Sequence, residues 1–139
     1  MAVDYGDART GIAVSDLSGT ITGDAWVLSL KDRTDIVGEI GAEATTRGVS
    51  VIVVGYPLNM DGTAGPRAQI SEQFAGSLRE ILAAAGQNGI EVVLWDERMT
   101  TMSAHRILTD VGKFGKKRKK TVDAVAASLI LENYLQSLS

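Results

Sequence analysis

Two short runs of apolar and β-branched residues constrain the fold of this chain most. Residues 49–54 read VSVIVV and residues 90–95 read IEVVLW, with little of the alternation that a half-exposed strand shows. Such runs are typical of parallel strands that are covered on both faces. Parallel neighbours need a helical connection, and residues 66–85 between them repeat apolar residues at helical spacing. The chain therefore predicts an α/β fold.

Further strands and helices alternate along the rest of the chain. Strands are expected within residues 20–30 and over residues 2–5 and 11–15, which flank a tight hairpin. Periodicity and stop signals predict helices over residues 32–47, 66–85, 100–111 and 121–138. The apolar face expected for the second helix consists of Ile70, Phe74, Leu78, Ile81, Leu82 and Ala85.

The order of these elements predicts how they assemble. Three strands at the start form an antiparallel meander, and the later strands, each reached through a helix, lie parallel. The expected fold is a mixed five-stranded sheet with helices on both faces. In such a sheet the functional site lies at the carboxyl ends of the parallel strands.

Size and composition exclude several classes of protein. A chain of 139 residues suits a single domain over residues 1–139 and is too short for a two-lobed enzyme. It has no cysteine and one histidine, His105, which excludes disulfides, thiolate zinc sites and most histidine triads. No apolar run reaches the roughly 18 residues of a membrane span, and no signal peptide is visible. We therefore expect a cytoplasmic protein without a membrane partner.

A cluster of positive charge precedes the last expected helix. Six of the fourteen basic residues lie within eight positions, and the remainder of the chain carries a net charge of about −9. Like charges this dense repel one another unless a polyanion neutralises them. A solvated loop is the alternative, but the pattern favours nucleic acid as the partner. The cluster consists of Lys113 and the basic run, by which we mean Lys116, Lys117, Arg118, Lys119 and Lys120.

Three carboxylates stand where a sheet of this kind gathers functional groups. Asp4 lies inside the first strand, where burial is costly unless the carboxylate binds turn amides, an ion-pair partner or a metal. Asp96 and Glu97 end the strand of residues 90–95, and because successive side chains alternate, only one is expected to enter the site. Asp123 is expected in the first turn of the last helix, where the helix dipole alone would favour it.

Together these carboxylates predict a cation site. At ~4 Å and an effective dielectric constant near 20, two carboxylates repel by about 4 kcal/mol, so a cluster of them needs cations. Oxygen ligands without histidine or cysteine select Mg²⁺ or Mn²⁺. Two such ions can activate a water and stabilise the leaving oxygen in phosphodiester hydrolysis.

Basic and amide side chains near these carboxylates are candidates for substrate contact. Gly6 and Gly11 allow an anionic group to approach the first hairpin closely. The loop of residues 55–62 opens the following helix, whose free amides attract phosphate. Besides the basic run, the candidate contacts are Arg9, Asn59, Arg67 and Arg98.

Four blocks of the sequence resemble one family of nucleases. They read DYGDARTGIAVSD at 4–16, GYPLNMDGTAGP at 55–66, WDERMTT at 95–101 and KKRKKTVDAVAASLIL at 116–131. In this order they resemble the YqgF family, also called RuvX, of RuvC-like pre-16S rRNA nucleases and Holliday junction resolvases. The resemblance spans nearly the whole chain. Only three residues precede Asp4 where relatives have a longer start, so we expect a short first strand.

The resemblance implies a fold, a chemistry and a set of site residues. The fold is RNase H-like, and the activity is metal-dependent endonucleolytic cleavage that matures the 5′ end of 16S ribosomal RNA. Asp4, Glu97 and Asp123 correspond to the family's carboxylates. The implied partner is structured RNA, the pre-16S rRNA, within a ribosomal precursor particle.

Other functions remain open at this point. A resolvase of branched DNA would use the same chemistry. A nucleic-acid binding factor in transcription or ribosome assembly would need no carboxylate trio. An ATP-binding hairpin of the sugar-kinase type shares the spacing D-x-G-x-x-x-x-G, but those enzymes need two lobes.

Overall fold

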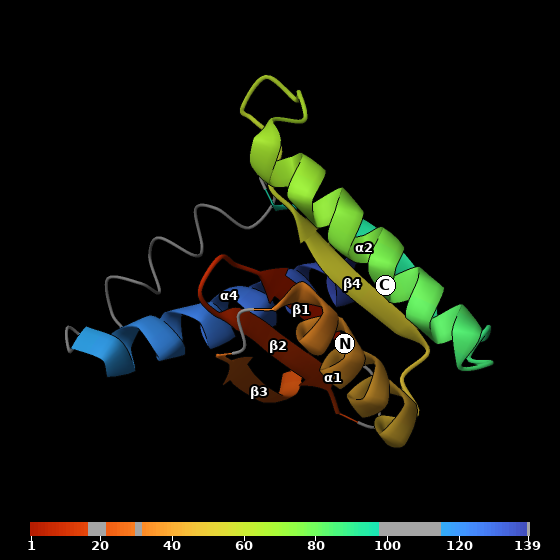
Figure 1. Ribbon diagram of the computed structural model, residues 1–139. Coiled ribbons are helices and arrows are strands. Elements are labelled where there is room, and N and C mark those ends of the chain that lie inside the picture. Colours follow the sequence, from red (N-terminus) through yellow and green to blue (C-terminus); the bar gives the residue numbers. More distant parts are fainter. Residues whose placement is uncertain (17–21, 30–31, 98–114, 139) are drawn as a thin grey trace.

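The computed structural model describes residues 1–16, 22–29, 32–97 and 115–138, and residues 115–121 by their backbone alone. Five strands form one sheet in the order β3-β2-β1-β4-β5 (Figure 1). The first three pair antiparallel, whereas β4 lies parallel to both β1 and β5, as the sequence predicts. The strands are β1 (Ala2–Tyr5), β2 (Thr10–Ser15), β3 (Thr22–Leu28), β4 (Val51–Tyr56) and β5 (Glu91–Asp96).

Helices cover both faces of this sheet. One face carries α1 (Arg33–Arg47) and α2 (Pro66–Ala84), and the other carries α4 (Gly115–Ser137). Because side chains alternate along a strand, Val3 packs toward α1 and α2 while its neighbour Ala2 packs toward α4. In the part of the chain that is described, no helix is both long and apolar enough to cross a membrane.

Local signals in the sequence explain where α1 and α2 begin and end. The side chain of Asp32 accepts a hydrogen bond from the amide of Thr34 at 2.8 Å, and Gly48 ends α1 with φ 68°. Pro66 occupies the first turn of α2. Two residues of its expected apolar face are misplaced: Ile70 is 38% exposed, and Ala85 is exposed and follows the end of the helix. Ala68 and Ser71 are buried instead.

Two expected boundaries near the site differ from the structure. Strand β4 runs on to Tyr56, so Gly55 belongs to the sheet and not to the following loop. Helix α4 begins at Gly115 rather than at residue 121, since lysine and arginine are good helix formers despite their mutual repulsion. The basic run is therefore helical, and Thr121 cannot cap this helix. The helix expected over residues 100–111 lies outside the described residues.

Helix α4 approaches the sheet closely because the residues between them are small. Ala2, Ala13 and Ala127 are fully buried in this layer. At Gly11 the fit is tighter still, since a Cβ atom built there would lie 2.7 Å from the carbonyl carbon of Asp123. Real Cβ atoms do not come this close to backbone atoms. Gly11 therefore sets the distance between β2 and α4.

Replacing Gly11 with alanine should destabilise the protein. We expect Gly11→Ala to lower the free energy of unfolding in urea by about 1–3 kcal/mol, because the new methyl group meets helix backbone that can move only as a whole. Gly38→Ala in α1 is the control, since its Cβ meets nothing within 4 Å. That variant should be neutral or stabilised. Equal unfolding curves for both variants would contradict the assigned role of Gly11.

Candidate active site

The site is built around Asp4 on the central strand β1. Asp4 pairs with Gly11 of β2, and the parallel register that joins Ala2 to Val53 sets Gly55 of β4 on its other side. Asp4 shares its face of the sheet with Ala2, so its side chain lies on the side of α4. Its carboxyl group is hydrogen-bonded to that of Glu97, which follows β5.

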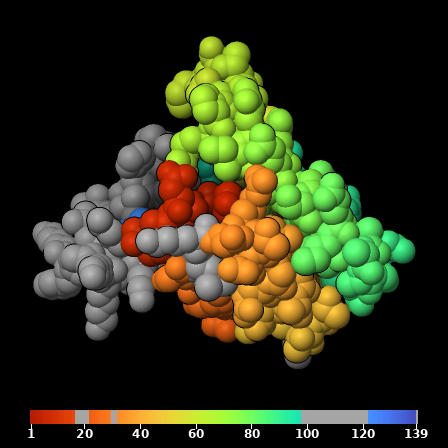
Figure 2. Space-filling view, viewed as in Figure 1, coloured from red at the N-terminus to blue at the C-terminus, as the bar shows by residue number. Residues whose placement is uncertain are grey.

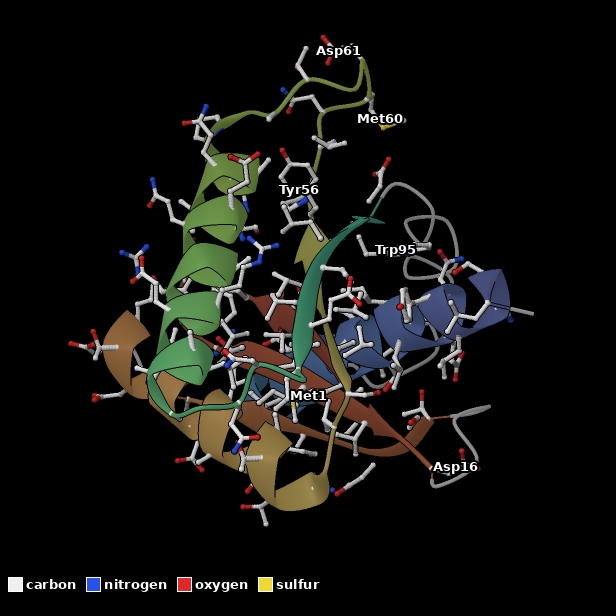
Figure 3. All side chains as sticks on the ribbon, turned by 90° about the vertical axis from the view of Figure 1, so that its right-hand side faces the viewer. Met1, Asp16, Tyr56, Met60, Asp61 and Trp95 are labelled. Carbon is white, nitrogen blue, oxygen red and sulfur yellow. The ribbon has the colours of Figure 1, made fainter. Side chains whose placement is uncertain are left out.

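The structure decides between the two acidic residues at the end of β5. Glu97 is the one that reaches Asp4, and the charge of Asp96 acts on Glu97 from the neighbouring position. Trp95, two residues before Glu97, donates a hydrogen bond to Asn133 of α4 at 2.8 Å and packs edge-on against Tyr134. Figure 3 shows Trp95 at the same end of the sheet as Tyr56. These contacts hold the end of β5 against α4.

Burial and mutual repulsion shift both carboxyl groups of this pair. Burial raises the pKa of Asp4, and the nearby charge of Asp123 raises it further. Burial and the charge of Asp4 raise the pKa of Glu97 to about 8. Arg67 lowers the pKa of both groups. At neutral pH the pair therefore keeps a proton, as two carboxylates that cannot both ionise do.

The third carboxylate lies next to this pair but is held by arginine. Asp123 is well inside α4 and not in its first turn, so the expected stabilisation by the helix dipole is wrong. Its Oδ2 accepts a hydrogen bond from Nε of Arg9 at 2.9 Å, and both side chains are largely shielded from water. Arg9, expected to meet substrate, thus neutralises a carboxylate in this structure.

The other expected contact residues are placed as follows. Nη1 of Arg67 binds Oδ2 of Asp7 at 3.1 Å, so α2 is tied to the β1–β2 hairpin. Figure 2 shows this hairpin, in red, at the surface beside the loop that precedes α2. Nδ2 of Asn59 donates to Oγ1 of Thr63 at 2.9 Å and shapes that loop. Arg98 lies outside the described residues, and the basic run belongs to the start of α4.

Two glycines are part of the site: Gly11, which was expected to let an anionic group approach the hairpin and instead faces helix backbone, and Gly55, which sequence reasoning did not assign to the site. Gly11 makes room for the backbone of Asp123, and Gly55 makes room for the carboxyl group of Glu97. A Cβ atom at Gly55 would lie 2.9 Å from Cδ of Glu97. The available signal was glycine inside a strand, which often marks the close approach of another group. Asp7 was missed because nothing in the sequence links it to Arg67.

The carboxyl oxygens of Asp4, Glu97 and Asp123 are ligands of the kind that a hard divalent cation prefers. A partly buried carboxyl pair that retains a proton is a place where a cation can substitute for that proton. Among the described residues, however, no three acidic, histidine or cysteine side chains lie together closely enough to hold a metal ion. Asp123, the third carboxylate of the site, is bound to Arg9 in this structure.

Comparisons with known proteins identify relatives of this chain. A family model described as RuvX, Holliday junction resolvase, matches residues 1–137. A protein of Geobacillus thermodenitrificans named "Putative pre-16S rRNA nuclease" is 40% identical over 139 residues, with 99% of this chain and 96% of that protein covered. A relative of the same name from Ruminiclostridium cellulolyticum is 37% identical, with 100% and 94% covered.

Solved structures share the fold at low sequence identity. RuvC of T. thermophilus in complex with a Holliday junction substrate has a TM-score of 0.57 at 12% identity, with 98% of this chain and 92% of that chain covered. The yeast mitochondrial Holliday junction resolvase Ydc2 has a TM-score of 0.56 at 12% identity, with 99% and 82% covered. The expected RNase H-like fold is thereby confirmed.

The expected family is confirmed as well. Membership implies nucleic acid as the class of substrate and, in general, dependence on a divalent metal. Because the family model spans almost the whole chain and the curated relatives align with it from end to end, the chain belongs to the RuvX family, a family of nucleases.

Proposed function

We propose that this protein is a metal-dependent endonuclease that hydrolyses phosphodiester bonds during 5′-end maturation of pre-16S rRNA. The observation that carries the proposal is the hydrogen-bonded pair of Asp4 and Glu97, with Asp123 beside it. A protein that only binds nucleic acid gains nothing from burying carboxyl groups that repel its ligand. The names of the curated relatives favour pre-16S rRNA as the substrate. The proposed setting is a ribosomal precursor particle in the cytoplasm.

The proposed metal ligands are Asp4, Glu97 and Asp123, and the proposed cofactor is two ions of Mg²⁺ or Mn²⁺. When bound, such ions activate a water and stabilise the leaving oxygen. To hold such ions, the Asp4–Glu97 pair would release its shared proton, and Asp123 would exchange Arg9 for a ligand position. Arg9 would then be available for a phosphate of the substrate.

Positive charge surrounds this carboxylate site and is proposed to hold the nucleic acid backbone. Arg67 lies close enough to Asp4 and Glu97 to lower their pKa, so it can also contact a phosphate bound there. Arg9 contributes from the other side, through its present partner Asp123. The further proposed contacts are Asn59, Arg98, Lys116, Lys117, Arg118, Lys119 and Lys120.

A second candidate is a nuclease of branched DNA, which the description of the family model favours. Its substrate would be a four-way junction. Parallel cleavage assays on precursor rRNA and on a four-way DNA junction, at the same salt and metal concentration, distinguish the two. Faster cleavage of the junction would overturn the RNA proposal and leave the metal-dependent site in place.

The carboxylates should be essential for cleavage and dispensable for folding. We expect Asp4→Asn, Glu97→Gln and Asp123→Asn each to lower the cleavage rate by orders of magnitude, because each weakens a metal ligand. Circular dichroism should show a folded protein, since each amide relieves repulsion within the site. Asp96→Asn is the matched control and should keep most of the activity. Full activity of Glu97→Gln would transfer the role to Asp96.

The metal-free protein should lose stability as the pH rises. Because the pKa of Glu97 is raised from 4.5 to about 8, the folded state binds more protons than the unfolded state between these values. Its contribution to stability is thus fully present below pH 4.5 and is lost as the pH rises through about 8. Glu97→Gln should flatten the pH dependence of the melting temperature. Glu39→Gln, at an exposed position of α1, should not.

Added Mn²⁺ should reverse this loss. Because the cation must displace the shared proton, millimolar Mn²⁺ should raise the melting temperature of the wild type more at pH 8 than at pH 6. The melting temperature of Glu97→Gln should rise little with Mn²⁺ at either pH. Identical pH curves for the wild type and Glu97→Gln would show that the pair does not hold the proton.

One side of α4 should carry the salt-sensitive binding of nucleic acid. Since α4 is helical from Gly115, positions 116 and 120 lie on the same side of the helix as Asp123, and positions 117 and 118 do not. Affinity falls as salt rises, and each lost phosphate contact reduces the magnitude of the slope of log affinity against log salt by about 0.7 for single strands and 0.9 for duplex.

Two charge-matched double variants test this asymmetry. Neutralising Lys116 and Lys120 to glutamine should lower that slope by up to roughly 1.4–1.8, the value for two contacts. Neutralising Lys117 and Arg118 should change it less, and neither pair should change the preference among sequences. A wild-type slope in all variants, including one that neutralises the whole basic run, would mean that the run only faces water.

A further inference from the structure

We infer that Gly55 is a positioning residue of the active site, because the missing side chain at this point of β4 lets Glu97 reach Asp4. The inference rests on the proposed function, since it concerns how two of the proposed metal ligands meet. It assigns a role in the chemistry to a residue that has no reactive group.

The order of the strands creates the need for such a residue. Strand β4 lies between β1, which carries Asp4, and β5, which leads to Glu97. Neighbouring strands are about 4.8 Å apart, so the backbones of β1 and β5 are separated by roughly 9.6 Å. The side chain of Glu97 must therefore cross the face of β4 to form its hydrogen bond with Asp4.

The crossing takes place over Gly55. Gly55 pairs with Trp95, two residues before Glu97, and thus lies on the same face of the sheet as Trp95 and Glu97. A Cβ atom at Gly55 would be 2.9 Å from Cδ of Glu97 and closer still to its Oε1. An alanine would therefore occupy the space that the carboxyl group of Glu97 now fills. The variant could keep its fold only if the side chain of Glu97 moved away from Asp4.

Gly55 has a second close neighbour, Ile130, and its effect has to be distinguished from that of Glu97. The same Cβ atom would lie 2.9 Å from Cδ1 of Ile130 in α4, so Gly55→Ala also crowds the core. Ile130→Val shortens that side chain and relieves the crowding without touching Glu97. Stability and site geometry can thus be tested independently.

The experiment compares Mn²⁺ binding by calorimetry, and melting temperature against pH, in Gly55→Ala, Gly55→Ala/Ile130→Val and Gly55→Ala/Glu97→Gln. We expect Gly55→Ala to bind Mn²⁺ about 10–100-fold more weakly than the wild type, the range typical for residues that orient metal ligands. Adding Ile130→Val should restore the melting temperature but not Mn²⁺ binding. Gly76→Ala in α2, whose Cβ meets nothing within 4 Å, should bind as the wild type does.

The double variant with Glu97→Gln identifies the route of the effect. If Gly55 acts through Glu97, adding Glu97→Gln to Gly55→Ala costs little further affinity, and both show the same flattened pH dependence. Additive losses, wild-type Mn²⁺ binding by Gly55→Ala, or recovery of binding with Ile130→Val would each overturn the inference. If the wild type itself binds no Mn²⁺, the proposed metal function fails, and the metal-free pH dependence still tests Gly55.

Discussion

The need to accommodate a carboxyl group, that of Asp4, on the central strand determines how the face of the sheet under α4 is built. Burying Asp4 is unfavourable unless its charge is shared or neutralised, and the protein supplies Glu97 as its hydrogen-bond partner. For that partner and for α4 to approach, the positions on either side of Asp4 must lack side chains. Gly11 and Gly55 meet this requirement, one for the backbone of a helix and the other for a carboxyl group.

The two faces of the sheet consequently differ in function: one holds most of the apolar core, and the other holds the site. Toward α1 and α2 the core contains large side chains, including Phe74, which stacks on Tyr5 with ring centroids 4.3 Å apart. Toward α4 the layer is thin and rich in alanine. Most of the apolar burial that stabilises the fold thus lies on the face opposite the site. The face with the site can tolerate a repulsive carboxyl pair because the other face does not depend on it.

The sequence predicted the strands, α1 and the change from antiparallel to parallel pairing well, because burial on both faces, helix caps and glycine stops are local signals. Alternation also predicted that only one of Asp96 and Glu97 enters the site, although not which one. Local signals failed where the answer depends on distant residues. Arg9 and Asp123 are 114 positions apart, and the role of Gly55 follows from a strand order that places β4 between two others. Helix α4 begins earlier than expected because the helix propensity of lysine and arginine outweighs their mutual repulsion.

The position of α4 after β5 in the chain bears on when the site is completed during synthesis of the protein. Chains emerge from the ribosome N-terminus first, at about 5–20 residues per second. A nascent chain that has completed β5 carries Asp4 and Glu97 but still lacks Asp123 and the helix that covers their face of the sheet. The proposed nuclease site is therefore finished only after α4, which follows β5 in the chain, has been translated. A nascent chain that ends before α4 would in this way lack both a proposed metal ligand and the cover of the site.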